Sequence, residues 1–583
     1  MVNITINNIP VTVEDGITIM EACKEAKMPV PSLCYLKGIN EIGACRVCVV
    51  EIKGVNKLIP ACNNVVQEGM DIYTNSPRVR EARRTNVELI LSQHDCLCAT
   101  CVRSGNCSLQ KIANDLGIIS TEYHKNLPAN TWPASFPLIR DASKCIKCMR
   151  CIQICDKVQG LNIWDVAKTG SRTTVGVSHN QNITESDCSL CGQCITHCPV
   201  GALRERDDSH RLLSLGGAFN DPDKVTIVQI APAVRTAWGE ELGLTREEAT
   251  PGRLVSALKA LGFDYVFDTN YGADLTIMEE GSEFLERMKH RDQYTFPMFT
   301  SCCPGWVRFL KARHPEMAGQ LSTAKSPHQM QGAITKTYFA EKMGIDPDKI
   351  FNISIMPCVA KKHEADIPNI NDAGHGKDVD MVLTTREVVR MIRADHLDVK
   401  NLPESEFDTP LGTGTGAAVI FGATGGVMEA ALRTAVELVT GESAPSVDYH
   451  DVRGTAGIKE ATYEVGGLKL NVCVASGLSN CDAVLKAVKS GEKHYDFIEF
   501  MACPGGCVNG GGQPTQPASV RNFVDLKSLR AKALYSEDEA KVIRKSHENP
   551  LMKKIYAEYL GEPGGEKAHH ILHTSYVKRE KLF

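Results

Sequence analysis

Two cysteines near the end of the chain are spaced so that both sulfurs can bind one metal cluster. They lie in the segment Met501-Ala-Cys503-Pro-Gly-Gly-Cys507-Val-Asn-Gly-Gly-Gly-Gln-Pro514. The glycines of this segment let the backbone fold tightly and approach a bulky inorganic group. A structural Gly-rich loop with two buried cysteines is the alternative interpretation of this segment taken alone. A radical-type CxxxCxxC cluster loop is excluded, because position 510 holds Gly.

Two upstream segments supply further thiols. They are Thr300-Ser-Cys302-Cys303-Pro-Gly-Trp306 and Met356-Pro-Cys358-Val-Ala-Lys361-Lys-His-Glu364. The three segments together offer four soft thiolates of the kind that hold a cubane iron–sulfur cluster. These four are Cys303, Cys358, Cys503 and Cys507. Cys302 is then left over.

The three segments, TSCCPGW, MPCVAKKHE and MACPGGCVNGGGQP, resemble the signatures of the [FeFe]-hydrogenases, and the similarity runs through the whole chain. In that family four cysteines hold a [4Fe-4S] cluster, and one of them also bridges to a two-iron subsite with CO, cyanide and a dithiolate. By position, the bridging residue here is Cys507. The resemblance therefore implies an enzyme that oxidises H2 and reduces protons reversibly at this H-cluster, with hydrogenase maturation proteins among its partners.

Two cluster sites are expected in the first 110 residues. One group resembles the plant-type ferredoxin, which holds a [2Fe-2S] cluster, and consists of Cys34, Cys45, Cys48 and Cys62. The other matches the HxxxCxxCxxxxxC site of the same hydrogenases and of NADH dehydrogenases, a [4Fe-4S] site, and consists of His94, Cys98, Cys101 and Cys107. A lone histidine is usually a core or surface residue, but the three cysteines at family spacing favour a ligand here. We interpret Cys23 and Cys96 as structural.

An internal repeat between residues 140 and 205 predicts two more [4Fe-4S] clusters. Each copy has the spacing CxxCxxCxxxC of the two-cluster bacterial ferredoxins, in which the fourth cysteine of each run binds the other cluster. One site is therefore Cys145, Cys148, Cys151 and Cys198, and the other is Cys155, Cys188, Cys191 and Cys194. Zinc sites do not show this crossed repeat. The expected cofactors are thus one [2Fe-2S], three accessory [4Fe-4S] clusters and one H-cluster.

Proton transfer needs acid and base groups beside the cluster. Cys302 adjoins a ligand without being one, and a thiol can exchange protons where a carboxylate would compete for iron. Glu280, Glu283 and Arg287 share one face of a predicted helix, at spacings i, i+3 and i+7. A solvated charged face is the plain interpretation of that pattern. By resemblance, Cys302, Glu280, Ser322, Glu283 and Arg287 form the outward proton relay of the family.

The family also implies a pocket around the two-iron subsite. Lys361 matches a lysine that donates to one cyanide. The rest of the wall matches Ala231, Pro232, Met356, Phe421, Gly422 and Met501. Two positions depart from the pattern: Ala233 stands where some members have Ser, and His328 where many have Gln. Neither change removes a ligand.

The elements that must position these groups follow from periodicity. Residues 1 to 80 alternate in polarity, turn at Asp15-Gly16 and continue into a helix from Thr18 to Lys27, which predicts a hairpin and a helix. Beyond residue 211, apolar runs alternate with helical stretches, which predicts parallel strands with the cluster loops at their ends. Those runs are Val225–Ile230, Tyr265–Phe267, Ile353–Ile355 and Leu470–Val474, and Cys473 and Cys481 fit this part as core residues.

The fold expected is therefore multidomain, α+β and α/β. Residues 1–80 form a plant-type ferredoxin-like β-grasp, 81–126 the [4Fe-4S] domain with one histidine and three cysteine ligands, and 127–210 a bacterial two-[4Fe-4S] ferredoxin-like domain. Residues 211–525 form a large α/β catalytic domain with parallel sheets. Residues 526–583 resemble the small subunit that other members carry as a separate chain, and we expect them to wrap the catalytic domain as a belt.

Charge, apolar runs and cysteine spacing indicate which partners and which compartment to expect. The 583 residues carry 65 basic and 70 acidic side chains, so the charge balance gives no sign of a nucleic-acid partner. No apolar run approaches the ~20 residues that a membrane span needs. The chain starts with a strand pattern instead of a secretory signal, which favours the cytoplasm. There, 24 cysteines at CxxC spacings indicate metal binding and not disulfides.

Other functions stay open beside the hydrogenase. A redox- or H2-sensing relative is one, although such relatives typically alter the cysteine that stands here as Cys302. An electron-transfer subunit of the NADH dehydrogenase kind is the other, although it would share only the first ~200 residues. Ferredoxin is the simplest electron partner, with NAD(P)-binding flavoprotein subunits as the second choice. The Gly-rich run from Gly412 to Gly426 matches neither nucleotide fingerprint, so any dinucleotide would bind to such a partner.

Overall fold

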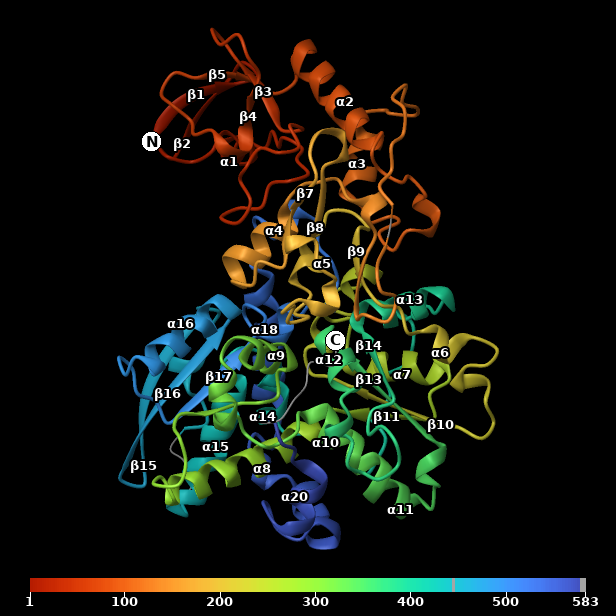
Figure 1. The fold of residues 1–583 in the computed structure, drawn as a ribbon, viewed down its shortest axis with the longest axis vertical. Coiled ribbons are helices and arrows are strands. Elements are labelled where there is room, and N and C mark those ends of the chain that lie inside the picture. The colour runs from red at the N-terminus through yellow and green to blue at the C-terminus, as the bar shows by residue number, and fades with distance from the viewer. Residues whose placement is uncertain (130, 443–445, 577–583) are drawn as a thin grey trace. The chain divides into compact units, whose positions relative to one another are not determined.

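A computed structural model describes residues 1–129, 131–442 and 446–576. Residue 130, residues 443–445 and the last seven residues of the expected belt, 577–583, lie outside the described residues. The chain divides into two compact units (Figure 1). The first comprises Met1–Ser186, Gln193–Arg204 and Thr515–Val524, and the second comprises Asp187–Gly192, Glu205–Pro514 and Asp525–Phe583. We describe each unit by itself.

The first unit begins with a five-stranded sheet in the order β2-β1-β5-β3-β4. Its strands are β1 (Val2–Ile6), β2 (Ile9–Val13), β3 (Val49–Ile52), β4 (Ile59–Pro60) and β5 (Asp71–Tyr73). β1 and β2 form the predicted hairpin, and helix α1 (Ile19–Glu25) follows it. Thr18 and Glu21 cap α1 reciprocally, which fixes where the helix starts. The hairpin and helix of the sequence analysis are confirmed.

The remainder of the first unit consists of short elements between cysteine loops. β7 (Trp164–Ala167) and β8 (Thr174–Val177) pair antiparallel. The other elements are α2 (Pro77–Leu91), α3 (Ser108–Asp115), β6 (Leu138–Arg140), α4 (Arg150–Gln153), α5 (Gln193–His197), β9 (Leu203–Glu205, whose last residue belongs to the second unit) and α17 (Ala518–Arg521). Most of this part of the unit is loop, so turns between short helices and strands position its cysteines.

The second unit contains a fully parallel sheet in the order β11-β10-β13-β14. Its strands are β10 (Val225–Ile230), β11 (Tyr265–Asp268), β13 (Ile350–Met356) and β14 (Met381–Thr384). Almost every residue of these strands is buried. Strands covered on both faces by helices read as continuous apolar runs, which explains why the sequence pattern located them. The predicted α/β architecture with parallel strands is confirmed.

A second sheet has the order β12-β17-β16-β15. β12 (Met298–Phe299), β17 (Phe497–Met501) and β16 (Leu468–Ser476) run parallel, whereas β15 (Ile458–Val465) pairs antiparallel with β16. The apolar runs of the sequence predicted parallel strands and gave no sign of this edge hairpin. Gly466 and Gly467 form its two-residue turn with φ of 57° and 82°, and a pair of positive φ values is what a tight hairpin turn requires.

Long helices pack around the two sheets. The central pair is α8 (Asn270–Lys289) with α10 (Pro327–Ile334), and α15 (Gly426–Thr440) also packs on α8. The other helices here are α6 (His210–Leu213), α7 (Pro251–Leu261), α9 (Pro304–Arg313), α11 (Ala340–Met343), α12 (Ala360–Glu364), α13 (Thr385–Ala394), α14 (Gly416–Val419) and α16 (Leu478–Lys489). Every helix of the described residues is too short or too polar to cross a lipid bilayer.

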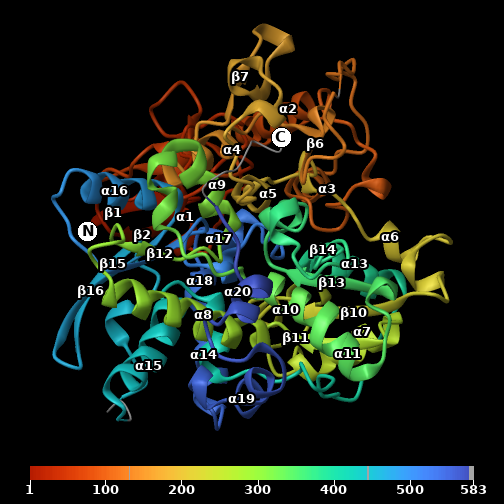
Figure 2. The ribbon, with the colours of Figure 1, turned by 60° about the horizontal axis from the view of Figure 1, so that its bottom comes forward.

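The C-terminal segment packs closely on this domain. Its helices are α18 (Leu526–Ala540), α19 (Pro550–Ile555) and α20 (Glu566–Leu572), and the blue ribbon of Figure 2 runs beside α8, α10 and α14. Arg433 of α15 is completely buried and donates to Glu429 at 2.7 Å and to Asp538 of α18 at 2.8 and 2.9 Å. A buried charge pair thus ties α18 to the catalytic domain.

Replacing Arg433 with Met should destabilise the second unit by about 1–3 kcal/mol, because Glu429 and Asp538 would lose their fully buried partner and keep only the less buried Arg453 and Arg544. The unfolding temperature and the release of the C-terminal segment by a protease would measure this. Lys349→Met is the matched control, since the ion pair of Lys349 with Asp223 is 51% and 81% exposed. An equal effect in both variants would contradict a structural role for the buried pair.

Candidate active site and cluster sites

Three loops of the second unit carry the cysteines predicted to bind the catalytic cubane. Cys303 lies four residues beyond β12, Cys358 two residues beyond β13, and Cys503 two residues beyond β17. All three loops therefore leave the carboxyl ends of strands, where α/β folds build their sites. Because these strands belong to two different sheets, the site forms where the ends of both sheets meet.

A cavity of about 770 Å³ lies among these loops. All four predicted ligands line it, and so do Cys302 and Lys361. The wall contains every other predicted pocket residue, namely Ala231, Pro232, Met356, Phe421, Gly422 and Met501, together with Ala233 and His328. The structure thus brings together residues that are up to 276 positions apart in the sequence, from Ala231 to Cys507.

The glycine-rich segment is pressed against its neighbours. Gly506 has a φ of 93°, and a Cβ there would lie 2.6 Å from the backbone nitrogen of Thr424. Gly512 donates its N–H to the carbonyl of Pro357 at 2.8 Å, and a Cβ on Gly512 would lie 2.8 Å from the nitrogen of Cys358. These approaches need residues without side chains, as the sequence pattern suggested. They hold Cys507 and Cys358 on one cavity.

The donor set fits an iron–sulfur group. Burial raises the pKa of the Cys303, Cys358, Cys503 and Cys507 thiols. A buried thiol loses its proton at neutral pH when a metal takes the charge, so four such sulfurs around one mostly apolar cavity suit a cationic cluster core. No disulfide joins cysteines of the described residues. The donors that line the cavity therefore suit a sulfur-ligated metal group.

Lys361 brings a positive charge to the wall of this cavity. Its ammonium donates to the carbonyl of Cys302 at 3.0 Å and to Glu364 Oε2 at 2.6 Å. Burial alone would raise the pKa of Glu364, but Lys361 and His328 bring it down to about 2. Glu364 is therefore ionised and anchors Lys361. The sequence analysis quoted Glu364 within its motif without giving it a role, although the i, i+3 spacing from Lys361 was the signal.

His328 shares the same carboxylate oxygen. Its Nε2 lies 2.5 Å from Glu364 Oε2, and its Nδ1 lies 3.0 Å from Ser354 Oγ. Burial, assisted by the Lys361 charge, lowers the pKa of His328 to about 4, so the imidazole is neutral at pH 7. A neutral imidazole with Nε2 protonated donates to Glu364 and accepts from Ser354. The His328 side chain is thus part of the wall that holds Lys361.

Among the predicted relay residues, Glu280, Glu283 and Arg287 lie on α8, Ser322 lies after α9, and Cys302 lies in the loop before α9. Glu280 is buried, and burial together with the Glu283 charge raises its pKa to about 8. Neither Glu280 oxygen forms a well-aligned hydrogen bond with the described residues. The Ser322 side chain and the Ser301 backbone are nevertheless close enough to offset part of the rise in its pKa. Burial, reinforced by Glu280, also raises the pKa of Cys302. Both groups therefore hold protons at neutral pH.

Glu283 forms the outer end of this group. Ser322 Oγ donates to Glu283 Oε2 at 2.9 Å, and Arg287 donates to Oε1 at 2.6 Å. The backbone N–H of Thr323 donates to both oxygens, at 2.9 and 3.1 Å. Glu280, Glu283 and Arg287 do share a face of α8, but the face is mostly buried and not a solvated charged surface. Thr323 was missed, because its contact is made by backbone and leaves no pattern in the sequence.

The predicted [2Fe-2S] cysteines come together in the first unit. The Cys34 thiol hydrogen-bonds with those of Cys45 and Cys62, and Cys62 in turn with that of Cys48. Cys34, Cys48 and Cys62 are buried and Cys45 is partly exposed. Four thiols joined by these three contacts without a disulfide fit a small iron–sulfur cluster.

His94 has the environment of a ligand. Its ring is buried, which lowers its pKa, and it has a backbone hydrogen bond with Lys144. Its Nδ1 is buried without a hydrogen-bond partner among the described residues. Cys101 and Cys107 lie near enough to Cys98 to help raise the pKa of that thiol, after burial as the main cause. A buried imidazole nitrogen without a hydrogen-bond partner suits a metal ligand, and the three thiols lie near one another, but the sharing of one cluster by all four residues stays a prediction.

The first crossed set of the repeat also comes together. A second cavity, of about 420 Å³, is lined by Cys145, Cys148, Cys151 and Cys198. This is the combination that the ferredoxin pattern requires. The other set stays a prediction, because Cys155 and Cys194 belong to the first unit whereas Cys188 and Cys191 belong to the second.

The surplus cysteines lie elsewhere. Cys23, Cys473 and Cys481 are fully buried in the core, as predicted. Cys96 is exposed, so it does not contribute to the core.

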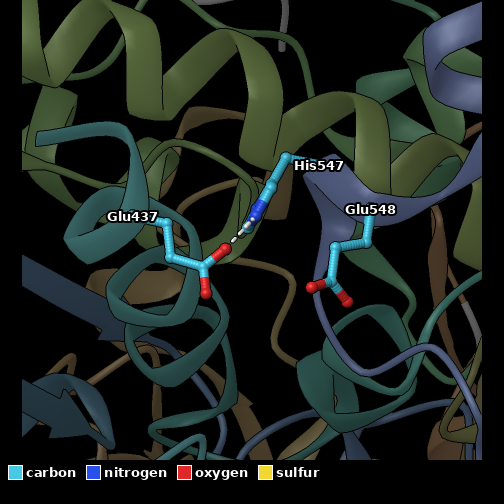
Figure 3. Close-up of side chains that lie close together, drawn as sticks. All are labelled: Glu437, His547 and Glu548. Carbon is cyan, nitrogen blue, oxygen red and sulfur yellow. Dashed lines mark hydrogen bonds and ion pairs between the residues drawn. The ribbon is translucent and has the colours of Figure 1, made fainter. Parts of the chain in front are cut away.

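One more group has metal-binding residue types. Figure 3 shows His547 directed at Glu437 of α15, at 2.6 Å, with Glu548 beside them. The Lys545 ammonium pairs with both carboxylates, at 3.4 Å to Glu548. This lysine supplies the positive charge that a metal would bring, so we interpret the group as an ion-pair cluster.

Family models match nearly the whole chain. Residues 224–511 match the model for the iron only hydrogenase large subunit, C-terminal domain, and residues 524–579 that for the iron hydrogenase small subunit. Residues 1–77 match a 2Fe-2S iron-sulfur cluster binding domain, 83–121 the NADH-ubiquinone oxidoreductase-G iron-sulfur binding region, and 144–202 a 4Fe-4S dicluster domain.

Similar proteins cover the chain from end to end. It is 46% identical to the NADP-reducing hydrogenase subunit HndD of Solidesulfovibrio fructosivorans over all of both chains. It is 40% identical to iron hydrogenase 1 of Clostridium pasteurianum, over 99% of this chain and 100% of that one. Among solved structures, a variant of the apo [FeFe]-hydrogenase HydA1 from Chlamydomonas reinhardtii matches with a TM-score of 0.56 and 43% identity, covering 63% of this chain and 98% of that one.

Replacing His94 with Cys should keep a cubane at the His94 site but lower its reduction potential, because a thiolate adds negative charge to the cluster. Turnover with an external electron carrier should slow more than proton exchange at the active site. Spectroelectrochemical titration measures the potential, and Cys96→Ser in the same loop is the control. An unchanged potential in His94→Cys would remove His94 from the ligands.

Proposed function

Since this chain belongs to the [FeFe]-hydrogenases and is a catalytic subunit with accessory iron–sulfur domains, we propose that its cavity of four thiols is the H-cluster site. Cys303, Cys358, Cys503 and Cys507 would hold the cubane, with Cys507 bridging to the two-iron subsite. When bound, this group supplies the redox chemistry and the open metal position for H2. The observation that carries the proposal is one cavity lined by four buried thiols, Cys302 and Lys361.

Lys361 would bind an anionic cyanide of the subsite. Its ammonium lines the cavity, and Glu364 and the Cys302 carbonyl fix its position. Two acceptors leave one of its three N–H donors for the cavity. Met356, Met501, Phe421, Ala231, Pro232 and Gly422 would form the wall that excludes water.

Cys302 would exchange protons with the subsite, and Glu280 would exchange them with Cys302. Glu280 suits this role because its raised pKa of about 8 lies near neutral pH, where a general acid–base group works best. Ser322 and Glu283 would continue the path outward through their 2.9 Å hydrogen bond. Arg287 would hold Glu283 in place without carrying a proton, because a guanidinium does not release one in proteins.

Electrons would pass through four accessory clusters: one [2Fe-2S] and three [4Fe-4S]. Their ligands are those of the sequence analysis, including the set Cys155, Cys188, Cys191 and Cys194. We also retain the domain boundaries 1–80, 81–126, 127–210, 211–525 and 526–583. The arrangement of thiols described above supports the ligand sets, and the ranges of the matching family models support the domain boundaries.

The electron partner is either ferredoxin or an NAD(P)-binding flavoprotein subunit. The full-length similarity to an NADP-reducing hydrogenase subunit supports the second partner, and the similarity to iron hydrogenase 1 leaves the first open. Assays of H2 turnover with reduced ferredoxin and with NADPH, each with and without added flavoprotein subunits, separate the two. We further propose a cytoplasmic location and dependence on hydrogenase maturation proteins. A sensory role would show slow turnover with both carriers.

Cys302→Ser should keep all iron and the CO and cyanide infrared bands, while turnover collapses by about 10²-fold or more, since a serine hydroxyl is a far weaker acid than a thiol. H2 assays and infrared spectroscopy of the same sample measure both quantities. Cys303→Ser is the matched comparison and should disturb the cubane and its bands. Wild-type activity of Cys302→Ser across pH would contradict the relay, and loss of its bands would make Cys302 a ligand.

A further inference from the structure

Glu279 directly precedes the relay residue Glu280 on α8 but makes its contacts with the C-terminal segment. It is completely buried. Tyr556 donates its hydroxyl to one Glu279 oxygen, and the Gly564 N–H donates to the other at 2.9 Å. His573 Nε2 lies 2.9 Å from that second oxygen. Residues nearly 300 positions away therefore fix the side chain beside Glu280.

The other ring nitrogen of His573 reaches the second half of the relay. His573 Nδ1 lies 2.8 Å from Thr323 Oγ1. The backbone of Thr323 donates to both oxygens of Glu283, and Thr323 directly follows Ser322. The Thr574 N–H also donates to the Thr323 carbonyl at 2.8 Å, so the C-terminal segment pairs with the relay segment like a short strand.

His573 joins the two contacts through its two ring nitrogens. The Gly564 N–H can only donate, so the Glu279 oxygen that it shares with His573 Nε2 accepts hydrogen bonds. Nδ1 lies in hydrogen-bond contact with the Thr323 hydroxyl. His573 is 5% exposed, and it stacks on the exposed His569 with 4.6 Å between ring centres. One buried imidazole thereby links the α8 position beside Glu280 to the position beside Ser322.

We propose that His573 is a positioning residue for the proton relay: it holds Glu279 and Thr323, and through them sets the separation of Glu280, Ser322 and Glu283. This inference rests on the relay of the proposed function. Proton transfer requires heavy atoms within hydrogen-bond reach, about 2.6–3.2 Å, so a small shift of α8 against residues 322–323 interrupts the path. His573 acts through these neighbours and touches no reacting atom.

Two conservative variants separate the two contacts. The amide nitrogen of Gln can take the place of Nε2, so His573→Gln should keep the bond to Glu279 and lose the bond to Thr323. The amide of Asn is shorter and reaches the place of Nδ1, so His573→Asn should keep only the contact with Thr323. His573→Ala loses both. His570→Ala changes an exposed histidine of the same helix and serves as the control.

The measurements are kcat and KM for H2, the infrared bands of the matured protein, and the unfolding temperature. We expect His573→Ala to lower kcat at least about tenfold, since a misplacement of 1 Å can cost that much. KM for H2 and the infrared bands should stay as in the wild type. His573→Gln or His573→Asn should recover part of kcat, and His570→Ala should behave as the wild type.

A second variant tests the same contact if His573→Ala does not fold. Thr323→Val keeps the shape of the side chain and removes only the hydroxyl, so kcat should fall without loss of the infrared bands. The inference is overturned if His573→Ala and Thr323→Val both keep wild-type kcat. It is also overturned if their kcat falls only in proportion to the intensity of the CO and cyanide infrared bands. A wild-type protein that shows the bands but no H2 turnover would instead overturn the proposed function.

Discussion

Four thiols from three distant loops must line one cavity. The glycines of the loops, the ends of the strands and the two sheets of the second unit together make this possible. The loops can approach each other because Gly506 and Gly512 present bare backbone to Thr424 and Cys358. The strand ends determine where the loops start, and the two sheets determine which ends face each other. A side chain at either glycine would force these backbones apart, because its Cβ would lie 2.6 Å from Thr424 N or 2.8 Å from Cys358 N.

Burial of charge around this cavity gives neighbouring groups opposite protonation states. Glu280 and Glu364 are both buried, yet the pKa of Glu280 is raised to about 8 and that of Glu364 lowered to about 2. The difference comes from their partners, because Glu364 contacts the Lys361 ammonium whereas Glu280 faces the Glu283 charge. One carboxyl is thus suited to exchange protons and the other to hold a cation still.

The sequence located what depends on local spacing. The cysteine motifs predicted which thiols line both cavities, and apolar runs predicted the parallel strands because those strands are buried on both faces. The antiparallel β15 was missed, since its outward residues are polar and its partner is known only from the fold. Bonds such as that of Glu279 to His573 join residues 294 apart and have no sequence signal.

Infrared spectroscopy of the purified protein, before and after loading with a diiron complex that carries CO and cyanide, tests whether the four-thiol cavity binds the H-cluster. CO and cyanide bands should appear in the loaded wild type and not in Cys507→Ser, while the visible spectrum of the accessory clusters is the same in both. Bands of equal intensity in Cys507→Ser, or their absence from a wild type with an intact cubane, would contradict this assignment.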